Sequence, residues 1–227
     1  MEDGKIMGKL NILYEDNHII VVVKPPNILS QADHTLDIDM LSLVKNYIKE
    51  KYKKPGNVYL GLVHRLDRPT EGIMVFAKTS KAASRLSKQI ENHTMKKKYL
   101  AVVNNKLAHN RDVWEDYLIK DKDGNTRVTT KEEGKLAVLS YEVLSYDKNT
   151  NKTLVEIDLK TGKHHQIRVQ FASRGYPLCG DQRYGKQDKT QLALVAYYLE
   201  FYHPTTKKLM SFTYQSKDNP YMSIFTM

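Results

Sequence analysis

The sequence predicts an α+β fold in which a mixed, mostly antiparallel sheet is flanked by helices, and three observations predict it. Short apolar segments rich in Val and Ile recur between turn residues, as β-strands do. Other segments carry apolar residues at helical spacing. Much of the second half consists of strand-like segments without an intervening helix, which favours α+β over alternating α/β. Because no repeat or low-complexity linker divides the chain, we expect a single domain over residues 1–227.

The N-terminal part predicts a hairpin followed by a helix. Residues 10–15 and 18–24 are rich in Ile and Val, a polar pair separates them, and two prolines end the second segment. Asp39 is expected to cap a helix that stops at residues 55–56, a Pro-Gly pair. The apolar positions of this helix are Met40, Leu43, Val44, Tyr47, Ile48 and Tyr52.

The middle of the chain places a charged loop between two apolar strands. Residues 58–63 and 73–77 are expected to be extended, and the polar residues 64–72 separate them. Thr79 can then cap a second helix before a strand at residues 98–103. The apolar face of that helix consists of Ala82, Ala83, Leu86 and Ile90.

The second half is expected to be mostly sheet. The segments that predict strands are residues 113–120, 135–144, 153–159, 192–201 and 210–214. A turn is expected at the Asp-Gly pair of residues 123–124. One short helix over residues 164–174 is expected to end at Gly175, in the left-handed capping position.

The amino-acid composition indicates the kind of binding partner and the cellular compartment to expect. The 36 Lys and Arg against 26 Asp and Glu leave a formal charge of +10, which attracts polyanions such as nucleic acid. The lone Cys179 cannot form an internal disulfide, and residues 1–9 have no apolar signal core, so we expect a cytoplasmic protein. The longest apolar segments are far shorter than the ~20 residues that cross a bilayer, so no membrane association is expected.

The sharpest chemical feature is Asp67, which lies between Arg65 and Arg68 and shortly after His64. Two guanidinium groups favour the ionised carboxylate, which can act as a nucleophile or a base. The alternative is an aspartate that only shapes the turn before Pro69. The position of this charged loop between two apolar strands favours a functional role, because rigid strands hold the side chain in place.

A second feature, residues 161–168, gathers basic side chains beside a glycine at an expected helix start. Such a segment is typical of anion binding, although it also fits a solvated basic helix end. Ile157 and His164 occupy positions where a nucleotide-binding phosphate loop requires Gly and Ser or Thr, so ATP is not implied. Residues 175–185 are rich in glycine and predict a tightly specified turn.

A metal site is an alternative interpretation, because His64, His164 and His165 with Asp67 offer ligand types that bind zinc. The spacing argues against it. The sequence has no His-Glu-x-x-His segment and no cysteine pair, and adjacent histidines on a helix would point to different faces. We therefore expect no metal.

Four segments in order resemble the motifs of the RluA-type pseudouridine synthases, which isomerise uridine to pseudouridine in ribosomal or transfer RNA. These segments are residues 64–72, 98–101, 161–168 and 180–185, with supporting similarity at residues 12–25 and 201–204. The resemblance covers nearly the whole chain. It implies the pseudouridine synthase catalytic fold, with a central basic cleft.

The resemblance also implies the site residues. By it, Asp67 is the catalytic aspartate, Tyr99 stacks on the target base, and Arg168 pairs with the aspartate. The residues expected to contact substrate are His64, Arg65, Arg68, Lys163, His165 and Ile167, the last as an aliphatic wall. The sequence departs from the family at Asn27, where glycine is usual, and asparagine tolerates left-handed backbone better than most residues.

The implied reaction detaches uracil from ribose, rotates it and rejoins it through carbon, so no cofactor is expected. The target base must leave its stack for a side chain to reach the glycosidic bond. Asp67 then attacks the sugar, attacks the base, or removes a ribose proton; the residues leave all three open, and we favour the last.

We expect RNA as the partner and a monomeric protein without the N-terminal RNA-binding domain that many relatives carry. Two other functions compete. One is a catalytically silent RNA-binding or ribosome-assembly module that uses the same basic cleft. The other is a metal-dependent phosphoesterase built on the histidines and aspartate considered above.

Overall fold

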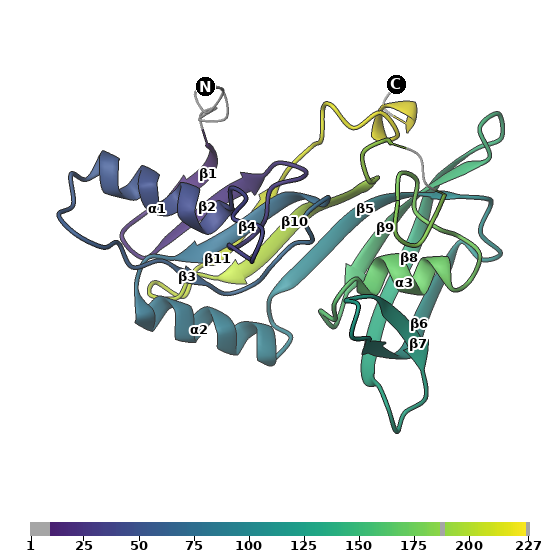
Figure 1. The fold of residues 1–227 in the computed structure, drawn as a ribbon, viewed down its shortest axis with the longest axis horizontal. Coiled ribbons are helices and arrows are strands. Elements are labelled where there is room, and N and C mark those ends of the chain that lie inside the picture. The colour runs from purple at the N-terminus through teal and green to yellow at the C-terminus, as the bar shows by residue number, and fades with distance from the viewer. Residues whose placement is uncertain (1–9, 187–188, 226–227) are drawn as a thin grey trace. The chain divides into compact units, whose positions relative to one another are not determined.

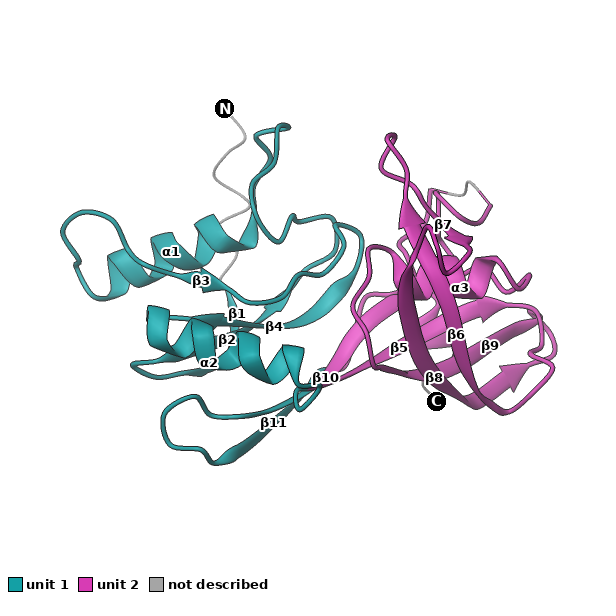
Figure 2. Ribbon diagram, turned by 90° about the horizontal axis from the view of Figure 1, so that it is seen from below, with its two compact units in different colours: residues 1–95, 199–214 teal, residues 96–198, 215–227 magenta. Residues whose placement is uncertain are grey.

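The computed structural model describes residues 10–186 and 189–225, and these residues form three α-helices and eleven β-strands (Figure 1). The chain divides into two compact units, coloured separately in Figure 2. The first comprises residues 1–95 and 199–214, and the second comprises residues 96–198 and 215–227. Helices and mostly antiparallel strands occur together, so the α+β prediction is confirmed. A single domain over the whole chain stays a prediction.

The first unit is a sheet with two helices. Its elements are β1 (Asn11–Glu15), β2 (Ile19–Lys24), α1 (Met40–Lys51), β3 (Gly61–Leu62), β4 (Glu71–Ala77), α2 (Ser80–Glu91), β11 (Leu209–Thr213) and the last residues of β10 (Leu194–Tyr202). The strand order runs β1-β2-β4-β10, with β3 beside β4 and β11 beside β10. The expected hairpin of β1 and β2 is confirmed.

The two central strands, β2 and β4, are buried along their whole length. They pair antiparallel, so that Lys24 at the end of β2 lies opposite Gly72 near the start of β4. One face of these strands, which includes Val75, packs against Leu86 of α2. Figure 2 shows α1 on the opposite side. Successive strand residues point to opposite faces, and helices on both sides explain why neither face is polar.

Helices α1 and α2 begin directly after their predicted cap residues. The side chain of Asp39 accepts a hydrogen bond from Ser42 N at 3.0 Å, and that of Thr79 accepts one from Ala82 N at 3.1 Å. Both residues satisfy backbone donors that the first turn of a helix leaves unpaired. Helix α1 ends at Lys51, before the Pro-Gly pair at which the pattern stops.

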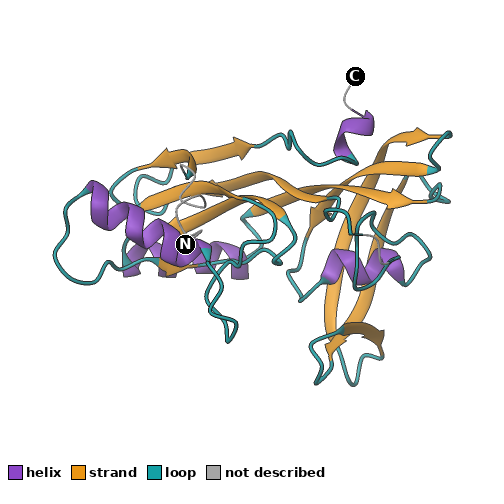
Figure 3. Ribbon diagram, turned by 45° about the horizontal axis from the view of Figure 1, so that its top comes forward, coloured by secondary structure: helices purple, strands orange, loops and turns teal. Residues whose placement is uncertain are grey.

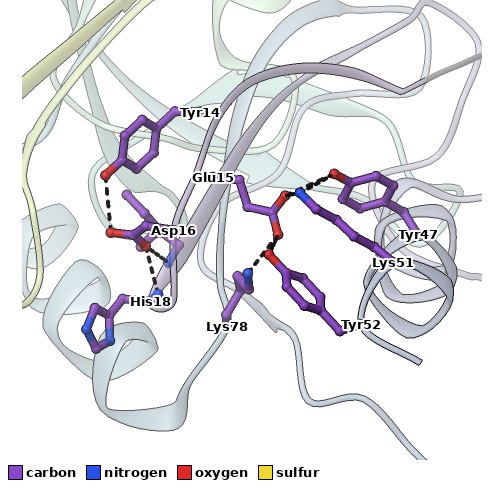
Figure 4. Close-up of polar contacts among 9 residues, drawn as sticks. Tyr14, Glu15, Asp16, His18, Tyr47, Lys51, Tyr52 and Lys78 are labelled. Carbon is purple, nitrogen blue, oxygen red and sulfur yellow. Dashed lines mark hydrogen bonds and ion pairs between the residues drawn. The ribbon is translucent and has the colours of Figure 1, made fainter. Parts of the chain in front are cut away.

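A buried carboxylate joins β1 to α1 and to the segment after β4 (Figure 4). Glu15, whose side chain is 6% exposed, accepts hydrogen bonds from Lys51 and Lys78 at 2.7 Å each. The hydroxyls of Tyr52 and Tyr47 donate to it at 2.9 and 3.0 Å. Burial raises the pKa of Glu15, but these four hydrogen bonds outweigh that effect and lower it to about 2. The charged form is therefore the stable one in the folded protein.

Replacing Glu15 by glutamine is expected to lower the free energy of unfolding at pH 7 by about 3 kcal/mol, because Lys78 would keep a buried, uncompensated charge. The folded pKa of Glu15 lies near 2 and its ordinary value is 4.5. Its contribution is thus complete above pH 4.5 and is lost as the pH falls towards 2. Urea unfolding at pH 7 and pH 3 measures both effects.

The matched control is Glu142→Gln, because the carboxylate of Glu142 pairs with Arg111 and is 44% exposed. We expect that change to cost less than about 1 kcal/mol. Equal losses for the two variants, or a Glu15→Gln deficit that is the same at pH 3 and pH 7, would contradict the assigned role of the Glu15 network.

In its described residues, the second unit consists mainly of long strands, with one α-helix, α3. Figure 3 shows helices and strands in different colours. Its elements are β5 (Lys96–Asn104), β6 (Arg111–Lys120), β7 (Thr126–Thr129), β8 (Lys135–Asp147), β9 (Lys152–Leu159), α3 (Gln166–Ala172), the first residues of β10, and a 3₁₀ turn at Met222–Phe225. The order β10-β5-β9-β8-β6-β7 brings β6 next to β8. The pairs β5–β9, β9–β8, β8–β6 and β6–β7 are all antiparallel.

An aromatic cluster fastens α3 to this sheet. Trp114 of β6 lies with its ring centre 4.6 Å from that of Phe171 of α3 and 4.7 Å from that of Tyr141 of β8. Beside the cluster, Arg174 donates to Asp116 at 2.9 Å. This packing holds α3 against β6 and β8, and so restrains the loop that precedes the helix.

The structure differs from the expected elements in three places. Only Gly61–Leu62 of the extended segment 58–63 pairs as a strand, and β7 was not expected. The third helix is shorter than residues 164–174, although Gly175 does adopt the expected left-handed backbone, with φ 81°. Among the described residues, no helix is both long and apolar enough to span a membrane.

Candidate active site

The loop that carries Asp67 leaves the sheet after β3 and returns to it at β4. Leu62 pairs with β4, and β4 itself begins at Glu71, so both ends of the loop are fixed on the same strand. Asp67 is half-buried, while Leu66 beside it is buried. The N–H of Thr70 donates to the carbonyl of Asp67 at 3.0 Å and closes a turn. These contacts agree with the prediction that strands on either side hold the Asp67 side chain in place.

A serine from the segment after β2 holds the residue before Asp67. Ser30 Oγ donates to the carbonyl of Leu66 at 2.7 Å and accepts from the Leu66 N–H at 3.0 Å. Both groups are buried, so the two bonds are shielded from water. Nothing in the sequence pattern marks Ser30, because its partner is 36 residues away.

Two of the basic neighbours of Asp67 connect its loop to other segments of the first unit. Arg68 extends to Asp37, with its NH1 2.7 Å from the carboxylate, and its Nε donates to the carbonyl of Asn27 at 3.2 Å. Arg65 is exposed. His64 Nε2 accepts a hydrogen bond from the N–H of Val75 at 3.1 Å, which ties the loop to β4. That Arg65 and Arg68 favour the ionised form of Asp67 stays a prediction.

In the second unit, Arg168 forms a buried, two-point ion pair with Asp181. The Nε of Arg168 lies 2.8 Å from Oδ2 of Asp181, and NH2 lies 2.7 Å from Oδ1. The two side chains are 6% and 0% exposed. Asp181 also accepts from the backbone N–H groups of Arg183 and Tyr184, at 3.0 and 3.1 Å. This parallel geometry fixes the plane of the guanidinium.

Asp181 is the residue that sequence reasoning missed. It lies in the glycine-rich segment 175–185, which predicted only a turn, and the turn is real. Gly180 before it has φ 71°, and a side chain there would meet the carbonyl oxygen of Gln191 at 2.2 Å. The glycine thus allows a close backbone approach that aims Asp181 at Arg168.

The two adjacent histidines do not lie on a helix, so the expectation that they face different ways is wrong. They precede α3, and their rings stack with centres 3.7 Å apart. His165 has φ 51°, in the left-handed region, and its Nδ1 lies 2.8 Å from the hydroxyl of Tyr184. Burial, followed by the charges of Arg168 and His164, lowers the pKa of His165 to about 2. His165 is therefore neutral at pH 7.

The segment before α3 is ordered by a glutamine. Gln166 Oε1 accepts from Thr161 Oγ1 at 2.8 Å and from the N–H of Lys163 at 3.0 Å, and its Nε2 donates to the carbonyl of Val138 at 3.1 Å. The side chain of Lys163 is half-buried at this segment. These hydrogen bonds explain why the otherwise basic segment 161–168 contains a glutamine.

Two further predicted site residues belong to the interior of the second unit. Tyr99 is 6% exposed and lies opposite Ile157 in the pairing of β5 with β9. Ile167 is 5% exposed on α3.

The predicted site residues thus fall into two groups. One lies in the first unit and contains His64, Arg65, Asp67 and Arg68. The other lies in the second unit and contains Tyr99, Lys163, His165, Ile167 and Arg168. The first group lies within residues 64–68 of one loop, whereas the second comes from β5 and from the segment at the start of α3. That the two groups meet across a basic cleft stays a prediction. Among residues 10–186 and 189–225, no cluster of His, Cys, Asp or Glu is arranged to hold a metal ion.

Residues 18–173 match the family model described as RNA pseudouridylate synthase. This chain belongs to that family. It is 35% identical over 206 residues to an uncharacterised RNA pseudouridine synthase, YhcT, of Bacillus subtilis, covering 89% of this chain and 67% of the relative. It is 33% identical over 213 residues to ribosomal large subunit pseudouridine synthase D of Nitrosomonas europaea, covering 88% and 60%. The RluA-type resemblance is confirmed, and the RNA pseudouridine synthase family consists of isomerases.

Two solved structures have the same fold as this chain. Human RNA pseudouridylate synthase domain containing 4 superposes with a TM-score of 0.78 at 20% identity, covering 94% of this chain and 91% of the human one. Human RNA pseudouridylate synthase domain containing 1 superposes with a TM-score of 0.75 at 21% identity, covering 95% and 86%. These likenesses confirm the predicted pseudouridine synthase fold.

Proposed function

We propose that this pseudouridine synthase modifies specific uridines of ribosomal RNA, acts as a single chain, and uses Asp67 as its catalytic carboxylate. The assignment of Asp67 rests on the hydrogen bonds and strand pairing that hold its loop. Its ends are fixed on β4, and Ser30 holds both backbone polar groups of the preceding Leu66. This support keeps the Asp67 side chain on a fixed backbone, as a catalytic group requires, and the family match supplies the reaction.

The reaction needs little beyond a positioned carboxylate. The C1′–N1 bond of uridine breaks, a C1′–C5 bond forms, C5 loses a proton and N1 gains one. Atoms and electrons balance within the nucleoside, so the proposal requires no oxidant, reductant or cofactor. An ionised Asp67 can attack C1′, attack the base, or take a ribose proton, and we propose the last.

The second unit offers groups that suit an extruded uracil. We propose that Tyr99 stacks on the base and that Arg168 also pairs with Asp67. A guanidinium carries five N–H donors, of which Asp181 takes two, so the existing ion pair is compatible with a second carboxylate. The buried Asp181 makes Arg168 rigid, and a rigid partner keeps a catalytic carboxylate aimed.

Ribosomal RNA is the proposed target class, because curated relatives at 33% identity are named as ribosomal large subunit enzymes. The formal charge of +10 suits a polyanionic partner. Transfer RNA is the second target to test.

The test uses the purified full chain with unmodified transcripts of ribosomal and transfer RNA, in monovalent salt with EDTA. Carbodiimide labelling followed by primer extension locates each pseudouridine. We expect new pseudouridines at discrete positions of the ribosomal transcript. Binding without any pseudouridine in either RNA would favour the silent RNA-binding module. Cleavage that EDTA abolishes would favour the phosphoesterase.

A further inference from the structure

The C-terminal end of α1 carries a dense group of lysines. Four of the six residues from 49 to 54 are lysines, and all six residues are exposed. Lys78 adds a fifth ammonium, which lies 4.8 Å from the centre of the Tyr52 ring. Two carboxylates, those of Glu15 and Glu50, belong to the same group, so the five lysines leave it a net charge of +3. We call its exposed cationic and aromatic part the α1 patch, which consists of Lys49, Lys51, Tyr52, Lys53 and Lys54.

An aromatic side chain is fixed within the α1 patch. The hydroxyl of Tyr52 donates to Glu15 at 2.9 Å (Figure 4), yet the residue is 45% exposed. The ammonium groups of Lys51 and Lys54 lie 5.4 and 6.0 Å from the centre of its ring. An exposed ring beside several cations is the combination that binds single-stranded nucleic acid, because a base stacks on the ring while the cations bind phosphates.

Most lysines of the α1 patch have no partner that explains them. Lys51 pairs with Glu15 at 2.7 Å, but the ammonium groups of Lys49, Lys53 and Lys54 form no hydrogen bond or ion pair with another described residue. The helix dipole favours a cation in the last turn, and this accounts for Lys49. The dipole does not account for Lys53 and Lys54, because both follow the end of the helix.

Lys53 carries its charge on a backbone conformation that favours glycine. The N–H of Lys54 donates to the carbonyl of Lys49 at 3.1 Å, and that of Lys53 donates to the carbonyl of Glu50 at 3.3 Å. The chain thus leaves α1 through Lys53, which has φ 47°. Glycine is the usual residue at such a helix end, because it has no β-carbon to clash. Glycine at this position would therefore stabilise the helix end and remove only the charge.

The α1 patch lies at the end of α1 that is farther from the Asp67 loop. The N–H of Leu41, in the first turn of α1, donates to the carbonyl of Ser30 at 3.3 Å, and Ser30 holds Leu66 beside Asp67. The 12 residues of α1 span about 18 Å at about 1.5 Å each. A stacked strand advances about 3.4 Å per nucleotide, so RNA at the patch would lie about five nucleotides from the one at Asp67.

The exposed side of α1 suits RNA better than an anionic lipid surface. The residues that α1 exposes are all polar, and its apolar residues Met40, Val44 and Ile48 are buried. A helix that lies in a membrane interface inserts an apolar face into the lipid. Charge without such a face favours a phosphate backbone in water.

We propose that the α1 patch binds the phosphate backbone of the RNA substrate outside the catalytic site. Its lysines neutralise phosphates, and Tyr52 offers a ring on which one base stacks. The inference rests on the proposed function, because the RNA that is bound is the substrate of that function. It assigns the patch no part in the isomerisation itself.

The test measures RNA affinity against salt concentration for the triple variant Lys49→Gln/Lys53→Gln/Lys54→Gln. The probe is the unmodified ribosomal transcript, and filter binding at a series of KCl concentrations gives Kd. Three contacts to a single strand contribute about 2 to the slope of log affinity against log salt. We therefore expect the slope to fall by about 2, with affinity about 100-fold lower at about 0.1 M salt and nearly equal to wild type at about 1 M.

The matched control is Lys88→Gln/Lys207→Gln/Lys208→Gln, which also removes three exposed lysines of the first unit. Lys88 lies in the last turn of α2, as Lys49 does in that of α1. Lys207 has φ 63° and so shares the left-handed backbone of Lys53. We expect this variant to bind RNA within about threefold of wild type, with the slope changed by less than about 0.5.

Lys53→Gly separates the loss of charge from any loss of folding. We expect its thermal unfolding temperature to rise, because glycine fits the left-handed backbone. Its affinity for the transcript should nevertheless fall about fivefold at about 0.1 M salt, which corresponds to one phosphate contact. Weaker binding by a more stable protein cannot result from misfolding, so this variant decides the matter if the triple variant does not fold.

An unchanged salt slope in the triple variant would overturn the inference, as would an equal loss in the control. Unchanged RNA binding with lost sedimentation on vesicles of phosphatidylserine and phosphatidylcholine would assign the α1 patch to a membrane instead. Asp67→Asn, which keeps the patch, should bind the transcript with the wild-type slope. A wild-type protein that binds RNA through the patch but forms no pseudouridine would refute the proposed function and not the RNA contact.

Discussion

Asp67→Asn is expected to lower the rate of pseudouridine formation by about 10³-fold or more, while RNA binding stays within about threefold of wild type. The amide has nearly the shape of the carboxylate but no negative charge, so it cannot serve as base or nucleophile. The turn closed by the Asp67 carbonyl uses backbone atoms only and survives the change. Single-turnover kinetics with saturating enzyme, together with a filter-binding isotherm, measure the two quantities separately.

The matched control is Asp33→Asn, which removes an exposed carboxylate of the first unit. Asp33 bonds only locally, to the N–H and the hydroxyl of Thr35 at 2.8 and 2.6 Å. We expect that variant to keep its activity within about twofold. Activity of Asp67→Asn above a tenth of the wild-type rate would show that the carboxylate is not required for chemistry.

Asp181→Asn is expected to lower the free energy of unfolding by about 3 to 5 kcal/mol and to abolish activity. The change leaves Arg168, 6% exposed on its side chain, with a buried and uncompensated charge, and it turns an amide N–H₂ towards guanidinium donors. The N–H groups of Arg183 and Tyr184 also lose a charged acceptor. Chemical unfolding followed by tryptophan fluorescence measures the loss, because Trp114 lies in the same unit.

Asp158→Asn provides the comparison, since Asp158 pairs with Lys160 near the surface of the same unit, where the lysine is 54% exposed. That pair should contribute less than about 1 kcal/mol. Similar losses of stability in the two variants would mean that the Arg168–Asp181 pair contributes no more to stability than a surface ion pair.

Local chemistry explains why much of the fold could be predicted. Asp39 and Thr79 begin helices because each can bond a backbone N–H three residues ahead, and that signal is complete within a few residues. Gly175 likewise has the predicted positive φ, three residues after the end of α3. The hairpin of β1 and β2 follows from two apolar runs around a polar pair.

The features that the sequence did not predict depend on contacts between residues that are far apart in the chain. Asp181 meets Arg168 across 13 residues, and Lys24 meets Arg68 across 44. A lysine at a strand end ordinarily reaches solvent, and backbone carbonyl acceptors leave no signature in the sequence. The sequence predicts a helix that begins at His164, yet His165 adopts a left-handed backbone that local propensity disfavours.

If Asp67 carries out uridine isomerisation in cellular RNA, the pseudouridine map of the cell must depend on this residue. Ribosomal and transfer RNA would be compared from cells that have this gene, lack it, or lack it and carry a copy encoding wild type, Asp67→Asn or Asp33→Asn. We expect one or more ribosomal pseudouridines to disappear on deletion and to return with wild type and Asp33→Asn but not with Asp67→Asn. An unchanged pseudouridine map on deletion, or full restoration by Asp67→Asn, would contradict the account.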